Sequence, residues 1–86
     1  MAIVTLRYWA AAKEAAGTAE EKIVAETLAG ALAAAGGAAR QDSRFRAVLA
    51  RSSFLIDGAP VGVRAPDAVI LDDAAVIEVL PPFAGG

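Results

Sequence analysis

The sequence predicts an α+β fold in which a mixed β-sheet packs on one main helix, with short helices beside it. Strand-like runs with alternating apolar residues occur near both ends of the chain, and an alanine-rich helical stretch lies between them. The 86 residues suffice for one domain, which buries about 60% of the surface of its unfolded chain. Alanine accounts for 23 of the apolar residues, so the large apolar side chains fill one sheet and one or two helices.

The first predicted strand covers residues 2–9, AIVTLRYW. Val4, Leu6 and Tyr8 alternate with polar residues, which is the period-two pattern of a half-buried strand. We expect Trp9 to lie in the core, with its indole N–H bonded to a carbonyl.

Residues 10–16, AAAKEAA, predict a short helix, and Gly17 is placed to end it at the C′ position. Residues 18–26, TAEEKIVAE, predict a second strand, whose only large apolar residues are Ile23 and Val24.

The main helix is expected within residues 28–37, LAGALAAAGG, and Gly36-Gly37 are expected to end it. Thr27 is a natural N-cap for this segment. Leu28, Leu32 and Ala35 fall on one helical face, which we expect to pack on the sheet.

A further helical turn or two is expected after Ser43, which can serve as the N-cap. Phe45, Val48 and Leu49 follow at the spacing of one helical face. The arginines of this region fit a solvated face better than a dock for an acidic partner; they are Arg40, Arg44, Arg46 and Arg51.

Residues 53–58, SFLIDG, predict a strand that runs into a turn. Asp57 and Gly58 both tolerate positive φ angles and suit that turn. Val61 and Val63 are then expected to form a short return strand.

Three short segments precede the end of the chain. Pro66 and Asp67 start a turn, and residues 69–71 form a brief apolar segment. Asp72 and Asp73 fit turn chemistry better than cation binding, because two carboxylates without further ligands make a poor site.

The last predicted strand covers residues 75–80, AVIEVL, in which Ile77 faces one side of the sheet and Glu78 the other. Pro81 and Pro82 lack the N–H group that a strand pair needs, so we expect pairing to stop there.

Composition excludes several classes of function. Without cysteine or histidine, the chain has no disulfide, no thiolate and none of the commonest general bases and metal ligands. The net charge of −2 has mixed signs and favours no nucleic-acid partner. No signal segment and no run of 18 apolar residues occurs, so we expect a cytoplasmic protein that does not bind membranes.

The final residues form a separate unit in this interpretation. Residues 1–80 make the folded domain, and residues 81–86 an extended functional tail that reaches about 20 Å. Gly85 and Gly86 have no Cβ and pass through slots too narrow for other residues. The tail therefore presents the carboxylate of Gly86 to other proteins.

The tail also carries a family resemblance. Residues 80–86, LPPFAGG, resemble the end of the ubiquitin-like sulfur carriers, including molybdopterin synthase small subunits: an apolar residue, two prolines, an apolar residue, a small residue and two glycines. Residues 6–21, LRYWAAAKEAAGTAEE, resemble the family's first strand, alanine-rich helix and glycine. The chain has Ala74-Ala75 where the family usually has Gly-Asp, and Asp57-Gly58 where it usually has Asn-Gly.

The resemblance implies a β-grasp fold and a use for Gly86. In that family an adenylyltransferase similar to ubiquitin-activating enzymes uses ATP to adenylate the terminal carboxylate, and a sulfur donor protein converts it into a thiocarboxylate. The tail then enters the active site of the molybdopterin synthase large subunit, which transfers the sulfur to a pterin precursor. The carrier binds no cofactor and is not itself catalytic. The resemblance implies that Gly86, with Gly85 before it, forms the reacting end. The residues implied in contacts with partners are Pro81, Pro82, Phe83 and Ala84.

Several alternatives stay open at this point. Carriers for thiamine or cysteine biosynthesis use the same chemistry. A ubiquitin-like modifier would attach Gly86 to lysines of other proteins, and a β-grasp binding module would work without covalent chemistry. Gly85-Gly86 alone is typical of a frayed terminus. Phe83 is either an anchor in a partner's groove or a side chain folded onto its own sheet.

Overall fold

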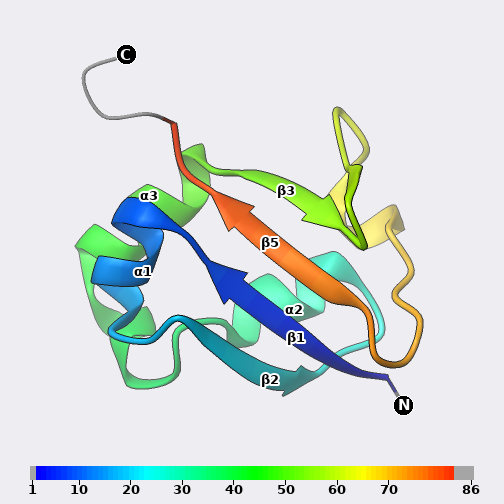
Figure 1. Ribbon diagram of the computed structural model, residues 1–86, viewed down its shortest axis with the longest axis horizontal. Coiled ribbons are helices and arrows are strands. Elements are labelled where there is room, and N and C mark those ends of the chain that lie inside the picture. Colours follow the sequence, from blue (N-terminus) through cyan, green and yellow to red (C-terminus); the bar gives the residue numbers. More distant parts are fainter. Residues whose placement is uncertain (1, 83–86) are drawn as a thin grey trace.

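The computed structural model describes residues 2–82, apart from the side chains of Ala38 and Arg40. Five strands alternate with three α-helices and two short 3₁₀ helices, η1 and η2, in the described part of the chain (Figure 1). In chain order these elements are β1 Ile3–Tyr8, α1 Ala10–Ala16, β2 Glu20–Val24, α2 Leu28–Ala34, η1 Gly37–Gln41, α3 Ser43–Arg51, β3 Ser53–Ile56, β4 Ala59–Pro60, η2 Pro66–Ala68 and β5 Val76–Leu80.

The strands form one mixed sheet in the order β2-β1-β5-β3-β4. The central pair, β1 and β5, is parallel, and every other neighbouring pair is antiparallel. The parallel pair joins the two ends of the described chain, because β1 is the first strand and β5 the last. The last strand therefore lies in the middle of the sheet, with hydrogen-bonded neighbours on both sides.

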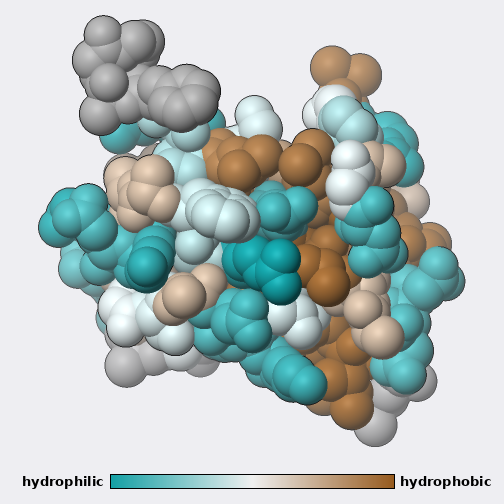
Figure 2. All heavy atoms as spheres, viewed as in Figure 1, coloured by the Kyte–Doolittle hydropathy of each residue, from teal (hydrophilic) through white to brown (hydrophobic). Residues whose placement is uncertain are grey.

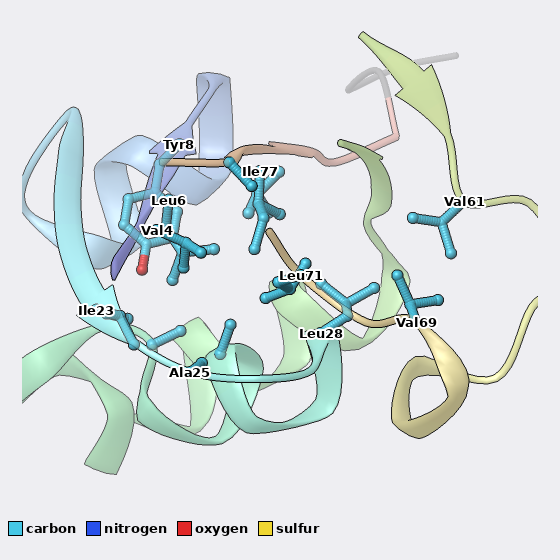
Figure 3. Close-up of a cluster of buried hydrophobic side chains, with 14 of the residues drawn as sticks. Val4, Leu6, Tyr8, Ile23, Ala25, Leu28, Val61, Val69, Leu71 and Ile77 are labelled. Atoms are coloured by element: carbon cyan, nitrogen blue, oxygen red, sulfur yellow. The ribbon is translucent and has the colours of Figure 1, made fainter. Parts of the chain in front are cut away.

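Helices cover one face of the sheet, and the other face is open (Figure 1). The buried face carries the alternate residues of the central strands, including Leu6 and Ile77, which are fully buried. Leu28 of α2 packs into the same cluster, together with Leu71 from the segment before β5 (Figure 3). Burial of each such side chain contributes roughly 1.5–3 kcal/mol, so this face drives folding.

The sequence predicts one main helix, whereas the structure has two helices of similar length after β2, α2 and α3. The helix expected to be the main one, α2, spans 7 residues, whereas α3 spans 9. Phe45 of α3 is buried and meets Tyr8 of β1 edge-on, with ring centroids 5.9 Å apart and an interplanar angle of 80°. This is a favourable arrangement for aromatic rings. Both helices therefore contribute to the core.

The predictions for β1 and for the end of α1 are confirmed. In β1, Val4, Leu6 and Tyr8 are buried as the alternation requires. Helix α1 ends at Gly17, whose φ of +77° and N–H bond to the Lys13 carbonyl form the expected left-handed cap.

The two predicted N-caps have different outcomes. The Thr27 side chain accepts a hydrogen bond from the Gly30 N–H at 3.1 Å and caps α2 as expected. The prediction for Ser43 is wrong, because Asp42 caps α3 with its Oδ1 atom 2.8 Å from the Arg44 N–H. Ser43 is the first residue of that helix. An aspartate one residue earlier competes for the same free N–H groups, and its negative charge suits a helix N-terminus.

The turn after β3 is confirmed, but the return strand is wrong in its position. Asp57 and Gly58 have φ angles of +50° and +85°, as a two-residue hairpin requires, so pairing resumes at once in β4, before Val61. Val61 instead enters the core and Val63 is fully exposed. Gly62 lies between these valines with a φ of +65° and redirects the chain.

The turn before β5 uses an alanine where glycine is favoured. Ala74 has a φ of +69°, and its N–H donates to the Ile3 carbonyl at 2.8 Å. The Asp73 carboxylate accepts the Ile3 N–H at 2.8 Å, and the Asp72 carbonyl accepts the Ala75 N–H. The two aspartates therefore act as turn residues, as predicted.

A polar network anchors the loop between α2 and η1. The Tyr8 hydroxyl donates to the Glu21 carboxylate, and the Gly36 N–H donates to both the hydroxyl and the carboxylate, at 3.1 and 2.8 Å. A Cβ at position 36 would lie 2.6 Å from the Phe45 ring, so only glycine fits. Burial raises the pKa of Tyr8 well above its ordinary value of 10.0, and the hydrogen bond to Glu21 and that residue's charge raise it further.

Candidate functional site: the root of the C-terminal segment and the open sheet face

The strand that leads into the C-terminal segment is held on both sides. Val79 of β5 is paired with Tyr8 of β1, and Leu80 is paired with Ser53 of β3. The Trp9 N–H adds a bond of 3.3 Å to the Val79 carbonyl. The chain therefore leaves the domain from a strand that is hydrogen-bonded on both sides.

Strand pairing stops where the sequence predicts. Strand β5 ends at Leu80, and Pro81 and Pro82 have no regular secondary structure. Pro81 is half-buried and Pro82 is exposed, so the chain moves from the domain into solvent over these two residues. The other predicted site residues lie outside the described part of the chain and stay predictions; they are Phe83, Ala84, Gly85 and Gly86.

The core position predicted for Trp9 is wrong. Its side chain is 45% exposed, and its indole N–H donates to the Glu78 carboxylate at 3.2 Å rather than to a carbonyl. The reason is the alternation in β1: since Tyr8 points into the core, the next residue points away from it. Trp9 is also the single residue between β1 and α1, which places it beside the root of the C-terminal segment.

A row of charged residues crosses the open face of the sheet. Arg7 is paired with Glu20 on one side and with Glu78 on the other. The Arg7 Nε atom donates to the Glu20 carboxylate at 3.4 Å, and both side chains are about half exposed. Such an ion pair contributes at most about 1 kcal/mol to stability, so it acts mainly as surface charge.

Apolar side chains lie beside this charged row. Val76 and Leu80 of β5 and Leu55 of β3 are half-buried on the open face. Ile3 and Val24, paired at the far corner of β1 and β2, are 52% and 55% exposed. Figure 2 shows apolar surface over β3 and β5 that extends to this corner, with hydrophilic surface over β1 and β2. The open face thus combines an apolar area with charged neighbours, the usual composition of a docking surface.

A shallow depression of about 720 Å³ lies next to the root of the C-terminal segment. It runs from Trp9 along α1 to the loop before β2. Lys13 and Glu14 of α1 and Thr18 of the loop border it. Trp9 stands between this depression and the end of β5. A partner that receives the C-terminal segment has an exposed aromatic ring to contact at this place.

The described residues form neither a candidate metal centre nor a helix that could span a membrane. Residues 2–82 contain no group of three or more histidine, cysteine, aspartate or glutamate side chains placed to hold a metal ion. Within the same residues, no helix is long and apolar enough to cross a lipid bilayer. The described part of the site is a surface beside the point at which the chain leaves the sheet.

Sequence reasoning missed the open face as part of the site. Neither residue type nor membership of a strand shows that a side chain reaches the open face. The signal is the position of the residue in the alternation, as it is for Trp9, Leu55 and Leu80. The residues that alternate with the buried positions of β1 and β5 all reach the open face. The register between β5 and β3, which brings Leu55 next to Glu78, is not visible in either strand alone.

Comparison with known proteins supports the fold. No family model and no curated protein gives a significant match to the sequence. Among solved structures, small archaeal modifier protein 1 from Methanosarcina acetivorans superposes with a TM-score of 0.79 at 24% identity, over 100% of this chain and 98% of that one. The same modifier from Haloferax volcanii gives 0.74 at 17% identity, over 98% and 99% of the two chains.

A third similar structure is a protein–protein complex of subunits 1 and 2 of the molybdopterin-converting factor from Helicobacter pylori. Its matching chain gives a TM-score of 0.69 at 20% identity, over 98% of this chain and 99% of that one. These identities are all below 25%, so the likeness concerns the fold. The chain has the ubiquitin-like β-grasp fold, with its five-stranded mixed sheet and helices on one face.

Proposed function

We propose that this chain is a ubiquitin-like sulfur carrier and that the carboxylate of Gly86 is its functional group. The observation that supports this most is the position of β5. The last strand is bonded on both sides in the middle of the sheet, and the chain leaves it through Pro81 and Pro82 toward solvent. The sequence then continues with Phe-Ala-Gly-Gly. That the protein ends at Gly86 in the cell is part of the proposal.

The proposed chemistry takes place on partner enzymes. A carboxylate resists attack by a nucleophile, so an adenylyltransferase first activates it: a carboxylate oxygen bonds to the α-phosphorus of ATP, and pyrophosphate leaves. Sulfur at the oxidation level of sulfide, supplied by a donor protein, then bonds to the carbonyl carbon while the bond to AMP breaks. The product is a thiocarboxylate on Gly86. This chain contributes the group and its delivery, and the partners contribute acid–base and electrostatic catalysis.

The open face fits the need for a partner in this scheme. A large subunit that receives the tail has to hold the domain while the tail enters its active site. The apolar area around Leu55 and Leu80 borders the root of the tail, and Trp9 is exposed beside it. The subunit 1–subunit 2 complex from Helicobacter pylori contains a chain of the same fold. We therefore propose a large subunit as a partner of this chain.

Within sulfur carriers we propose the molybdopterin branch. The string Leu-Pro-Pro-Phe-Ala-Gly-Gly at residues 80–86 resembles the tail of molybdopterin synthase small subunits. Carriers for thiamine or cysteine biosynthesis are the alternatives. Recovery of a molybdopterin synthase large subunit with this chain from its native cell would decide for the molybdopterin branch.

Intact-mass spectrometry tests the carrier function directly. The purified chain is incubated with an adenylyltransferase of the ubiquitin-activating type, ATP and a sulfur donor. We expect one oxygen to be replaced by sulfur. A chain with one residue appended after Gly86 should stay unmodified, whereas a chain with the same residue added before Met1 should be modified normally. Equal modification of both extended chains would place the sulfur elsewhere and contradict the proposal.

A ubiquitin-like protein modifier is the second candidate. Two of the similar structures are small archaeal modifier proteins, one of them with a TM-score of 0.79. A modifier uses the same adenylated Gly86 but transfers it to lysine amines. Adducts of higher mass in cell extracts, lost when Gly86 is deleted, would favour this function. A chain that keeps its biological activity without residues 83–86 would instead favour a binding module.

A further inference from the structure

An apolar groove runs along the edge of the molecule formed by α3, β3 and the loop that follows β4. It consists of two adjoining depressions, of about 360 Å³ on the α3 side and about 420 Å³ on the loop side. Both are lined by Phe54 of β3 and by Pro66 at the start of η2, and the two depressions together are called the groove. No described residue of the C-terminal segment lines it.

The groove exists because the elements around it are short. Strand β4 has only two residues, which pair with Leu55 and Ile56. At Phe54 the pairing is reduced to one bond of 3.0 Å from the Val61 N–H to the Phe54 carbonyl. Helix α3 lines the other side with Arg46, Leu49 and Ala50, which share one helical face at positions i, i+3 and i+4. Phe54 is half-buried at the floor of the groove. An apolar channel of this kind on a small domain is a candidate for protein contacts.

Positive charge is concentrated in the part of the sequence that contains most residues of the groove. Residues 40–66 contain five of the chain's eight basic residues but only two of its ten acidic residues, a net charge of +3. The rest of the chain has three basic and eight acidic residues, a net charge of −5. The two acidic residues of the positive segment are engaged elsewhere, Asp42 as the cap of α3 and Asp57 with the Val76 N–H at 3.0 Å.

An arginine borders each end of the groove. Arg46 of α3 lines the first depression, and Arg64 lines the second. The Arg64 guanidinium donates to the carbonyls of Val61 and Pro60 at 3.0 and 3.2 Å, which holds its charge at the rim. Within residues 2–82, neither arginine forms an ion pair with an acidic side chain. Asp67, next to Pro66, is the acidic residue nearest to the groove in sequence, and it does not line it.

We propose that this groove binds an acidic, apolar peptide segment of a partner protein. One or two large apolar side chains of the peptide pack over Phe54, and flanking carboxylates pair with Arg46 and Arg64. The charge asymmetry selects this occupant: a basic or purely apolar segment would leave both arginines without a counterion, and the negative remainder of the surface repels polyanions such as nucleic acid. The interaction is independent of the Gly86 carboxylate and adds a second binding surface to the molecule.

Peptide selection tests the proposal without a known partner. A phage library of random peptides is selected on the immobilised full chain. We expect enriched peptides to combine Leu, Phe or Trp with neighbouring Asp or Glu, and to lose affinity as salt is raised. The absence of enrichment, or the enrichment of basic peptides, would overturn the proposal.

Matched variants locate the binding of the best synthetic peptide, measured by fluorescence anisotropy. Arg46→Glu should weaken it about tenfold, since attraction is replaced by repulsion worth about 1.4 kcal/mol. Ala50→Trp should weaken it at least as much by filling the groove. Arg44→Glu and Ala47→Trp change exposed residues of the same helix that do not line the groove, and should stay within about twofold.

Two outcomes complete the test. A chain without residues 83–86 should bind the peptide as tightly as the full chain, which separates this surface from the carrier function. Equal binding by Arg46→Glu and the unchanged protein would overturn the proposal, and this surface substitution leaves the core intact even if Ala50→Trp disturbs folding.

Discussion

Ala74 and Gly17 show how a single residue sets local backbone strain in this protein. Both have a left-handed conformation, with φ angles of +69° and +77°. Glycine adopts this conformation freely, whereas alanine has a steric conflict between its Cβ and the backbone. The conformation at Ala74 is retained because its N–H bonds to Ile3 and anchors the turn before β5.

Exchanging the two residue types should therefore have opposite effects. Ala74→Gly should raise the free energy of unfolding by about 1 kcal/mol, since it removes the strain. Gly17→Ala should lower it by about 1 kcal/mol, because an added Cβ meets no atom within 4 Å and only strain remains. Urea denaturation of the two variants measures both changes. A destabilised Ala74→Gly variant would mean that the Ala74 side chain contributes packing that outweighs the strain.

Tyr8 predicts how stability depends on alkaline pH. Its pKa is raised in the folded protein, chiefly by burial, so the folded state holds the phenol proton more tightly than the unfolded state. The stabilising effect is fully present below the unfolded pKa of 10.0 and is lost as pH rises above it. The free energy of unfolding should fall by up to about 1.4 kcal/mol per pH unit from this group.

Tyr8→Phe provides the control for this prediction, because it keeps the ring that meets Phe45 and removes the titrating group. Its stability should fall less steeply above pH 10 than that of the unchanged protein. Tyr8 is the only tyrosine, so the ultraviolet absorbance of tyrosinate follows this residue alone. A phenol that titrates at its ordinary pKa in the folded protein would contradict the buried network.

At the level of elements, local patterns predicted strands better than they predicted caps and connections. The alternation of Val4 and Leu6 placed β1 correctly, because the period of two is a property of every half-buried strand. The same alternation places Trp9 on the open side, so its position in the chain decides its exposure, and the core position expected from an aromatic residue type is wrong. The return strand predicted at Val61 and Val63 is wrong because the chain changes direction at Gly62. Val61 is buried in the core and Val63 is exposed, which the local sequence does not indicate.

The cap of α3 is a prediction at this scale. Asp42→Ala should lower the free energy of unfolding by about 1 kcal/mol, because the Arg44 N–H loses its bond to the Asp42 carboxylate. Ser43→Ala should change it by less than about 0.5 kcal/mol, because Ser43 lies inside the helix and alanine is a good helix former. Thermal unfolding of the two variants compares the positions directly. A larger loss of stability in Ser43→Ala than in Asp42→Ala would mean that Ser43 is the N-cap.

Trp9 tests the role proposed for the root of the tail. Trp9→Ala should leave the free energy of unfolding within about 1 kcal/mol, since the exposed side chain loses one surface hydrogen bond. Adenylation of Gly86 by the activating enzyme should become about tenfold less efficient if the ring contacts that enzyme. Ile70→Ala is the matched control, since this side chain is 72% exposed and lies away from the tail root. An equal effect of both substitutions would argue against a specific contact at Trp9.

For the whole molecule, the strand order β2-β1-β5-β3-β4 places the last strand, which leads into the C-terminal segment, in the middle of the sheet. The chain's two halves meet in the parallel pair of β1 and β5, a pairing over long sequence distance that neither strand specifies alone. The sequence therefore predicts an α+β domain and its elements, while the strand order needs the folded chain or a resemblance to known folds. The tail can be predicted from its own residues. The open face can be described only once the register between the strands is known.

Removal of the tail should affect function and not stability. Deletion of residues 83–86 should change the free energy of unfolding by less than about 0.5 kcal/mol, because in the proposed function the tail is extended chain outside the folded domain. Sulfur loading should be abolished. Urea denaturation and loading assays on the same preparation measure both. A large loss of stability would mean that these residues are packed structure.

The most direct test of the central claim is the mass of the C-terminal tryptic peptide from the protein loaded with sulfur. Arg64 is the last basic residue, so trypsin releases residues 65–86 as one peptide that contains the whole tail. We predict that fragmentation places a sulfur atom in exchange for one oxygen on Gly86. An unmodified peptide from a preparation in which the activating enzyme and donor are active on another carrier would contradict the proposal that this fold presents its terminal carboxylate for activation.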